Sequence, residues 1–299
     1  MSHTANSFAL PRLPVIAIVG VGLIGGSIAA ALKSNGKVGR VLGVGRHRAS
    51  LAQAKDLGLI DEVLGLEQAV TRADIVILAT PVGAIAPLLK TMAPSLQPHT
   101  IVTDVGSTKQ SIVQQAAQCL KEKVSQFVPG HPIAGAEQTG PEAAQASLFQ
   151  QRYVILTPHA QSAKSAIDAV TLLWEQCGAR VLTMAPPVHD KVLASVSHLP
   201  HLLSSAYMWQ VAAAEDADQR LSIAGTGFRD ITRLAAGSPE MWHDIFLANQ
   251  DAVLGELREL RKVLAAFEDL LAAKDSDGIL EFLERAALAR RFWGSRRRQ

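Results

Sequence analysis

The first half of the chain alternates short apolar runs with amphipathic stretches. Apolar runs predict buried strands at Val15–Val19, Val41–Val44, Ile75–Thr80, Ile101–Asp104, Phe127–Val128, Tyr153–Thr157 and Val181–Met184. Helical periodicity predicts helices at Ile28–Ser34, Ser50–Leu57, Ala84–Met92, Gln110–Lys123 and residues 162–177. Strands that alternate with helices through short connections are typical of a mainly parallel sheet with helices on both faces. The pattern therefore predicts a doubly wound α/β fold.

The alternation stops at Pro186–Pro187, and the remaining patterns are helical. They predict helices at Val188–Ala214 (interrupted near residues 197–201), from Ser238–Pro239 to about Lys274, and from about Asp277 to Phe292. In the long helix an apolar seam, typical of lengthwise helix packing, is formed by Val253, Leu257, Leu260, Leu264, Phe267 and Leu271. We therefore predict an α/β domain at residues 1–186 and an all-α domain at residues 187–299. We expect a homodimer formed through the helical domain.

The composition is that of a folded protein without a nucleic-acid surface. Hydrophobic residues make up 48% of the 299 residues and charged residues 19%, which excludes disorder. The net charge of +2 includes Arg296–Arg298, and without these three it would be −1 (2 − 3). Cys119 and Cys177 lie in helical patterns, which favours reduced thiols. We expect a cytoplasmic protein without a membrane partner, because neither a signal peptide nor an apolar run of ~18 residues is present.

A glycine motif joins the first strand to the first helix. It reads Gly20-Val-Gly22-Leu-Ile-Gly25. In this setting the first glycine permits a tight turn, the second lets a pyrophosphate approach the backbone, and the third allows close helix–strand packing. The N-terminus of the helix offers free N–H groups to the phosphates. We predict a Rossmann-type domain that binds a dinucleotide at Gly20, Gly22, Leu23, Ile24 and Gly25. The alternative is a glycine-rich turn that binds nothing.

The second predicted strand lacks the acidic residue that usually binds a ribose 2′-hydroxyl. Arg46, His47 and Arg48 follow this strand, and the next acid is Asp56. Arginines at this position suit a 2′-phosphate, so we predict NADP as the cofactor, with NAD possible. The alternative is that the arginines only face solvent. Thr80–Pro81 follow the next parallel strand, and we expect them to contact the cofactor too.

A histidine stands where another strand ends. His131 lies between Pro129-Gly130 and Pro132, in a stretch too rich in glycine and proline for a helix. Histidine titrates near neutral pH, so one on a stiff loop suits proton transfer, and the alternative is a structural loop histidine. The carboxyl ends of parallel strands share one edge, where ligands bind. We therefore expect His131 beside the cofactor, with the hydroxyl of Ser107 orienting its ring.

Two further pairs of candidate site residues occur in the helical half. Arg229 and Arg233 are four residues apart, so they share a helix face that suits a carboxylate ligand. The alternative is a surface pair balanced by Asp230. His198 and His201 have no clear third ligand nearby, so we predict no metal site.

Taken together, five motifs resemble the prephenate/arogenate (cyclohexadienyl) dehydrogenases of tyrosine biosynthesis. They are GVGLIGGS at residues 20–27, DVGSTK at Asp104–Lys109, GHPIAGAEQTG at Gly130–Gly140, SHLPH at Ser197–His201 and GTGFRDITRLAAGSPEMW at Gly225–Trp242. The resemblance implies a dinucleotide-binding domain and a helical dimerisation domain. It also implies the oxidative decarboxylation of prephenate or arogenate, with hydride transfer to NAD(P)+. The products would be 4-hydroxyphenylpyruvate or tyrosine, and CO2.

The resemblance also implies a role for each matching residue. His131 would accept the proton of the substrate's ring hydroxyl, Ser107 would orient His131, and Arg233 would bind the ring carboxylate. The pocket would further be lined by Glu137, His201, Asp230 and Trp242. Two other functions remain open for this sequence. A β-hydroxyacid-type NADP dehydrogenase would need a catalytic lysine, for which Lys191 is the candidate, and a non-catalytic NADP sensor would not need this set of residues.

Overall fold

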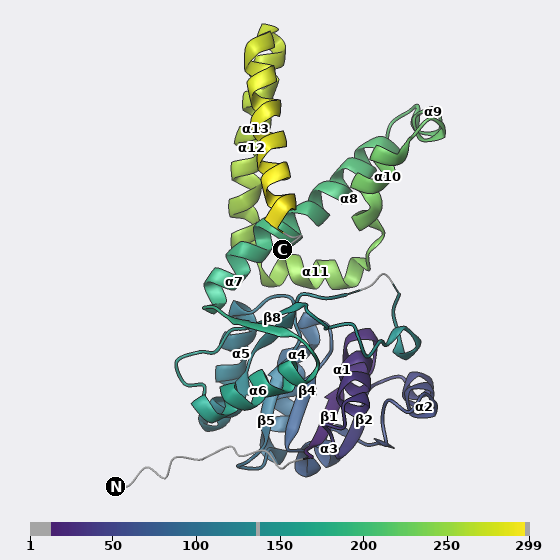
Figure 1. Ribbon diagram of the computed structural model, residues 1–299, viewed down its shortest axis with the longest axis vertical. Coiled ribbons are helices and arrows are strands. Elements are labelled where there is room, and N and C mark those ends of the chain that lie inside the picture. Colours follow the sequence, from purple (N-terminus) through teal and green to yellow (C-terminus); the bar gives the residue numbers. More distant parts are fainter. Residues whose placement is uncertain (1–12, 136–137, 297–299) are drawn as a thin grey trace. The chain divides into compact units, whose positions relative to one another are not determined.

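The computed structural model describes residues 13–135 and 138–296 (Figure 1). The chain forms two compact units, one within residues 1–250 and the other within residues 251–299. The first unit contains both sheets and the helices up to α11. The domain boundary expected at Pro186–Pro187 stays a prediction.

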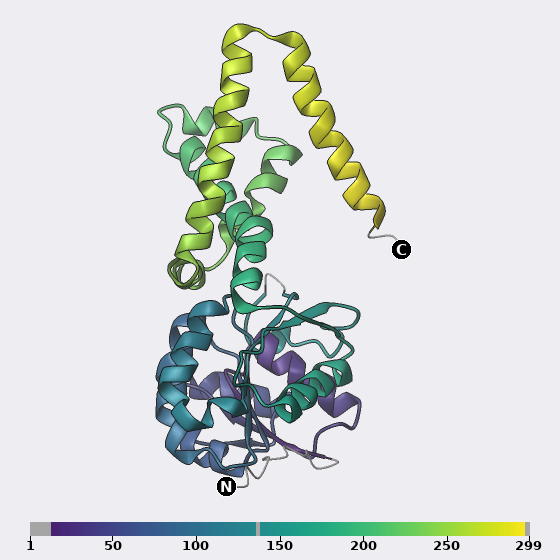
Figure 2. The ribbon, with the colours of Figure 1, turned by 90° about the vertical axis from the view of Figure 1, so that its left-hand side faces the viewer.

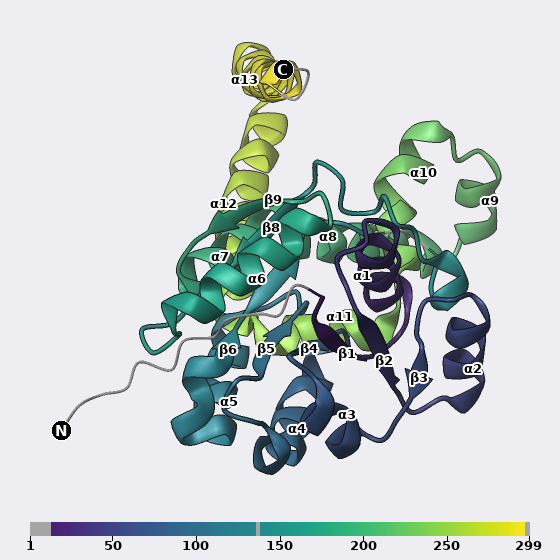
Figure 3. The same ribbon diagram turned by 60° about the horizontal axis from the view of Figure 1, so that its bottom comes forward.

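The predicted doubly wound sheet is confirmed. It has six parallel strands in the order β3-β2-β1-β4-β5-β6 (Figure 3). Their bounds are β1 Val15–Val19, β2 Arg40–Val44, β3 Glu62–Val63, β4 Ile75–Leu78, β5 Ile101–Asp104 and β6 Phe127–Val128. Val19 pairs with both Val44 and Leu78, and Leu78 pairs with Asp104, so the carboxyl ends of these strands share one edge. The strand ends from which the site was predicted therefore lie at the same edge of the sheet.

Helices cover both faces of the sheet (Figure 2). One face packs against α1 Leu23–Ser34, α2 Arg48–Asp56 and α6 Lys164–Gln176. The other packs against α3 Leu66–Arg72, α4 Val82–Met92 and α5 Gln110–Leu120. Both layers bury continuous apolar clusters, which explains why the strands read as unbroken apolar runs. The short elements β3 and α3 were not predicted from the sequence.

A second sheet has three strands in the order β7-β8-β9. These strands are β7 Gly130–Pro132, β8 Tyr153–Leu156 and β9 Arg180–Thr183. The sequence predicted a loop at His131, but His131 lies in β7 and pairs antiparallel with Ile155. Pro129 has no N–H to continue the ladder of β6, so the chain leaves the large sheet there. It stays extended and pairs with β8 instead.

The helical part of the first unit begins directly after β9. It contains α7 Pro186–Leu193, α8 Leu199–Ala212, α9 Ala217–Ser222, α10 Thr226–Thr232 and α11 Pro239–Ala248. The interruption predicted near residues 197–201 is a π-helical turn at Ala194–His198 between α7 and α8. Ser238 caps α11 by accepting a hydrogen bond from the Met241 N–H at 3.3 Å, as its position predicted. The long helix predicted from this start is divided at Asn249.

The second unit is a pair of helices, α12 Gln250–Ala273 and α13 Ser276–Arg296. The two helices diverge from the turn that joins them (Figure 2). Phe267 and Phe282 lie in contact, with ring centroids 4.9 Å apart. Leu264 and Leu271 of the predicted apolar seam are more than half exposed. Among the described residues, no helix combines the length and the apolar character needed to cross a bilayer.

Candidate active site

The glycine turn has the geometry that its sequence predicted. Gly20 has a φ of 96°, and a Cβ atom there would lie 2.3 Å from the Ala79 carbonyl oxygen. A Cβ atom on Gly25 would lie 2.2 Å from the Gly20 carbonyl oxygen. Around Gly22, in contrast, no atom of the described residues lies within 4 Å of such a Cβ atom, apart from its chain neighbours and the adjacent helix backbone. The first glycine thus permits the turn and the third the close packing, as predicted. The second leaves open space at the N-terminus of α1, and the pyrophosphate expected there stays a prediction.

The segments next to this turn are the ones predicted to contact a cofactor. The Gly20 N–H donates to the Val44 carbonyl at 2.8 Å, so β2 ends beside the turn. Exposed side chains then follow at Arg46, His47 and Arg48. Thr80 lies on the other side, with its Cγ2 atom 3.1 Å from a Cβ atom built on Gly20. Pro81 follows it as the cap residue of α4.

A chain of hydrogen bonds leads from His131 into α7. His131 Nδ1 lies 2.8 Å from His189 Nε2, and His189 Nδ1 lies 2.8 Å from Asp190 Oδ1. Asp190 accepts the backbone N–H groups of Lys109 and Gln110 at 2.7 and 2.8 Å, where α5 begins. His189 is completely buried, and His131 is partly exposed. His189 was not predicted from the sequence, although the His189-Asp190 pair, one residue beyond Pro186–Pro187, was a signal for it.

The structure restricts the predicted contact of Ser107 with His131 to one of the two ring nitrogens. Ser107 was expected to hydrogen-bond one ring nitrogen of His131, but His189 occupies Nδ1. Only Nε2 of His131 is then left for the Ser107 hydroxyl. Ser107 follows β5 at the edge of the sheet and is partly exposed. Its contact with His131 stays a prediction.

A buried ion pair fixes the strand that carries His131. The Lys109 ammonium is fully buried, bonds to Asp104 and donates to the Gly130 carbonyl at 2.8 Å. Asp104 in turn accepts the Gly130 N–H at 3.2 Å. Burial lowers the pKa of Lys109, against the opposing effect of Asp104. The motif from Asp104 to Lys109 therefore ties the end of β5 to β7.

The pKa of His131 is well below the ordinary histidine value. Burial is the largest cause, and the neighbouring His189, Lys109 and His198 act in the same direction. A lowered pKa keeps the imidazole neutral near pH 7. His131 is therefore in the protonation state that a general base requires.

A second group of side chains surrounds Trp242. The rings of His201 and Trp242 are stacked, with centroids 3.7 Å apart and an interplanar angle of 9°. His198 is completely buried, and its Nδ1 lies 3.1 Å from the Asn249 amide nitrogen, which also donates to the Asp190 carbonyl at 2.8 Å. Burial lowers the pKa of His198 to about 4. Two of the predicted pocket residues, His201 and Trp242, are thus in direct contact.

Arg233 and Asp230 lie on neighbouring exposed segments. Asp230 belongs to α10, and Arg233 begins the 3-10 turn Arg233–Ala236. This turn is attached to α8 by the Ala235 N–H, which donates to Ser204 Oγ at 3.0 Å. A Cβ atom on Gly237, directly after the turn, would lie 3.2 Å from His201 Cε1. The turn that carries Arg233 is thus next to the His201–Trp242 stack.

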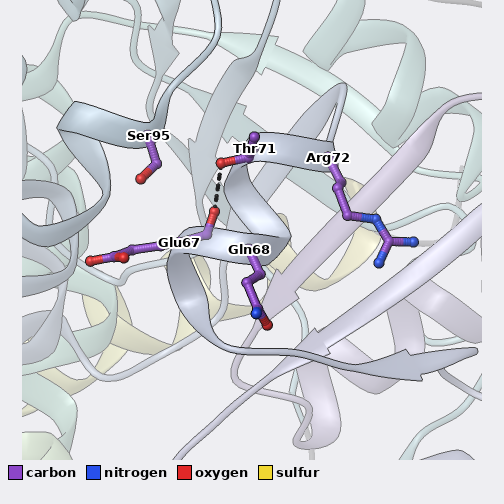
Figure 4. A pocket seen from close by; sticks show the side chains of 5 residues that line it. All are labelled: Glu67, Gln68, Thr71, Arg72 and Ser95. Atoms are coloured by element: carbon purple, nitrogen blue, oxygen red, sulfur yellow. Dashed lines mark hydrogen bonds between the residues drawn. The ribbon is translucent and has the colours of Figure 1, made fainter.

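Glu137 lies outside the described residues. Within residues 13–135 and 138–296, no group of three or more His, Cys, Asp or Glu side chains is arranged to hold a metal ion. A shallow hollow elsewhere on the surface is lined by Glu67, Gln68, Thr71, Arg72 and Ser95 (Figure 4). It contains none of the predicted site residues, and we assign it no chemistry.

Comparison with known proteins identifies the family. The family model "Prephenate dehydrogenase, nucleotide-binding domain" matches residues 28–183, and "Prephenate dehydrogenase, dimerization domain" matches residues 185–285. A prephenate dehydrogenase of Bacillus subtilis is 35% identical over 278 residues, which cover 91% of this chain and 74% of the relative. A cyclohexadienyl dehydrogenase of Zymomonas mobilis is 36% identical over 278 residues, which cover 92% of this chain and 94% of the relative.

A solved structure agrees with these sequence matches. It is that of prephenate dehydrogenase from Aquifex aeolicus in complex with hydroxyphenyl propionate and NAD+. Its TM-score is 0.88 at 33% identity, and the match covers 94% of this chain and 98% of that one. The chain belongs to the prephenate dehydrogenase family.

Proposed function

We propose that the protein catalyses the oxidative decarboxylation of prephenate, arogenate or both, with hydride transfer to a nicotinamide cofactor. The names of its relatives support this reaction. The observation that carries the proposal is a neutral histidine, His131, on a strand that leaves the carboxyl edge of the dinucleotide-binding sheet. A base beside a bound nicotinamide is what an alcohol oxidation needs.

The reaction divides between the cofactor and the residues of the chain. The bound nicotinamide supplies the acceptor for the hydride from the ring carbon that carries the hydroxyl. His131 takes the hydroxyl proton, and Arg233 holds the ring carboxylate in place. The carboxylate leaves as CO2, and the electrons of the broken bond make the ring aromatic. Because aromatisation drives the reaction, the protein mainly contributes orientation and one base.

Five further residues complete the proposed site. Ser107 helps to orient the hydroxyl and His131, and the stacked His201 and Trp242 form a wall of the pocket. Asp230 and Glu137 help to position the substrate. The exposed Lys191 is a poor candidate for the catalytic lysine of a β-hydroxyacid dehydrogenase, because such a lysine has to reach into the site.

We infer that NADP is preferred over NAD. The support is the exposed Arg46-His47-Arg48 segment after β2, together with the absence of an acidic side chain up to Asp56. A 2′-phosphate would meet cations there and no carboxylate. The Aquifex aeolicus relative was solved with NAD+, so the preference has to be measured on this chain.

The experiment uses four reaction mixtures. Prephenate and arogenate are each incubated with NAD+ and with NADP+, and the absorbance of the reduced nicotinamide is followed. Turnover with either substrate supports the reaction, and a higher kcat/KM with NADP+ supports the cofactor preference. A matched variant, Arg46→Gln, should lose the NADP+ preference without losing turnover with NAD+. Absence of turnover with both substrates would favour the NADP sensor.

We further propose a homodimer assembled through the helical half, with a domain boundary near Pro186–Pro187. The helical part of the chain exposes large apolar side chains, among them Trp209 at 76%, Ile223 at 82% and Leu264 at 56%. The matching family model is named for dimerization. Light scattering of the purified chain tests the proposal, and a monomer mass would refute it.

A further inference from the structure

We infer that His189 and Asp190 hold His131 in the one tautomer that leaves its Nε2 atom free to act as the base. His189 is thus a positioning residue for the reaction, acting through His131. This inference rests on the proposed function, because the base is useful only if His131 accepts a proton from the substrate.

The ionised carboxylate of Asp190 can only accept hydrogen bonds. Its Oδ1 atom accepts the Lys109 N–H at 2.7 Å, and its Oδ2 atom accepts the Gln110 N–H at 2.8 Å. These backbone groups belong to the N-terminus of α5, whose dipole favours a negative charge. The two backbone donors therefore fix the position of the carboxylate independently of its contact with His189.

The direction of the remaining hydrogen bonds follows step by step. His189 Nδ1 lies 2.8 Å from Asp190 Oδ1, so it has to be the donor. A neutral imidazole has one N–H, which leaves His189 Nε2 as an acceptor. His131 Nδ1, 2.8 Å from this atom, must then be the donor. The proton of His131 is consequently on Nδ1, and the lone pair is on Nε2.

Three separate elements define this geometry. His131 is on β7, His189 and Asp190 are on α7, and the two backbone donors are at the start of α5. The imidazole planes of His131 and His189 meet at 63°, an edge-on arrangement in which a ring N–H points at a lone pair. Because His131 is also held through β7, a change of tautomer would break a partly buried hydrogen bond.

The hydrogen bond to His189 also persists after the proton has moved. When Nε2 of His131 accepts the hydroxyl proton, the ring becomes a cation that still donates from Nδ1 to His189 Nε2. The same hydrogen bond therefore orients His131 in both protonation states, while burial and the neighbouring groups keep its pKa low, so that it can release the proton again.

Two variants of His189 separate positioning from packing. In His189→Gln the amide oxygen can accept from His131 and the amide nitrogen can donate to Asp190, so kcat should stay within about 10-fold of the wild type. In His189→Leu both bonds are lost, and kcat should fall about 10- to 100-fold with a nearly unchanged KM. The control is His159→Gln. His159 is half-buried beside the backbone of Phe127, at the beginning of β6, and its replacement should leave kcat unchanged.

The tautomer itself is measured by 15N NMR of histidine-labelled protein, with the His131 signals assigned from their loss in His131→Asn. In the wild type we expect a protonated Nδ1 and a bare Nε2 on His131, and in His189→Leu a mixture of tautomers. A proton on Nε2 of wild-type His131, or a doubly protonated His189, would overturn the inference. So would a His189→Leu variant with unchanged kcat and unchanged tautomer.

The outcomes remain decisive if a variant does not fold. Urea unfolding and cofactor binding show whether His189→Leu is native, and the wild-type spectrum decides the tautomer without it. Absence of turnover by the wild type on both substrates would refute the proposed function. In that case the measured tautomer of His131 alone would test the hydrogen-bond chain.

Discussion

The buried His198 should make the protein lose stability as the pH falls. Its side chain is 1% exposed, and burial lowers its pKa from 6.5 to about 4, against the opposing effect of Asp190. The unfolded chain therefore binds a proton at a pH where the folded chain does not. Stability is fully present above pH 6.5 and is lost as the pH falls toward the folded pKa.

The size of this loss follows from the difference between the two pKa values. One pKa unit corresponds to about 1.36 kcal/mol. A pKa lowered from 6.5 to about 4 corresponds to about 3 kcal/mol. Between pH 6.5 and about pH 4.5, His198 alone should remove about 2 to 3 kcal/mol from the free energy of unfolding. This is a large share of the total stability of a typical protein.

Urea unfolding at a series of pH values measures the effect, using wild type and His198→Gln at one protein concentration. Glutamine is chosen because its amide oxygen can still accept the hydrogen bond that Asn249 donates to His198. His131 and the carboxyl groups are present in both proteins, so the difference between the two pH profiles comes mainly from His198, with a smaller part from the effect of His198 on the pKa of His131. The variant should lose less stability on acidification. Parallel profiles would refute the reasoning, because they would show that His198 is not held neutral by burial.

Three further predictions concern the cofactor and the reaction. Gly25→Ala should cost about 1–3 kcal/mol in urea unfolding, because the new methyl group would lie 2.2 Å from the Gly20 carbonyl oxygen. Gly22→Ala has no such clash and should weaken cofactor binding in a fluorescence titration without a comparable loss of stability; equal stability losses would contradict this. Because the pKa of His131 is lowered by burial, the acid limb of the kcat/KM profile should lie below pH 6.5, and a limb above that value would be inconsistent with a buried neutral base. In steady-state kinetics His131→Asn should mainly lower kcat and Arg233→Ala should mainly raise KM, whereas the opposite pattern would mean that the two roles are exchanged.

Local patterns in the sequence determined most of the large sheet and the position of the cofactor turn. A strand covered on both faces has to be apolar throughout, so β1, β4 and β5 were readable as continuous runs. The glycines could be assigned separate roles because each role depends on the absence of a Cβ atom, which is a property of the residue itself. The position of His131 near the carboxyl edge followed from the rule that parallel strands end at one edge.

Only the tertiary structure decided which groups surround His131. Its partner His189 is 58 residues away and on a different element, and no spacing rule connects an antiparallel strand with the first turns of a later helix. The pairing of β7 with β8 and the division of the long helix at Asn249 likewise depend on contacts between residues that are distant in the sequence. Asn249 bonds to His198 and to the backbone of Asp190. Such contacts join residues distant in sequence, and their energy depends on burial that exists only after the chain has folded.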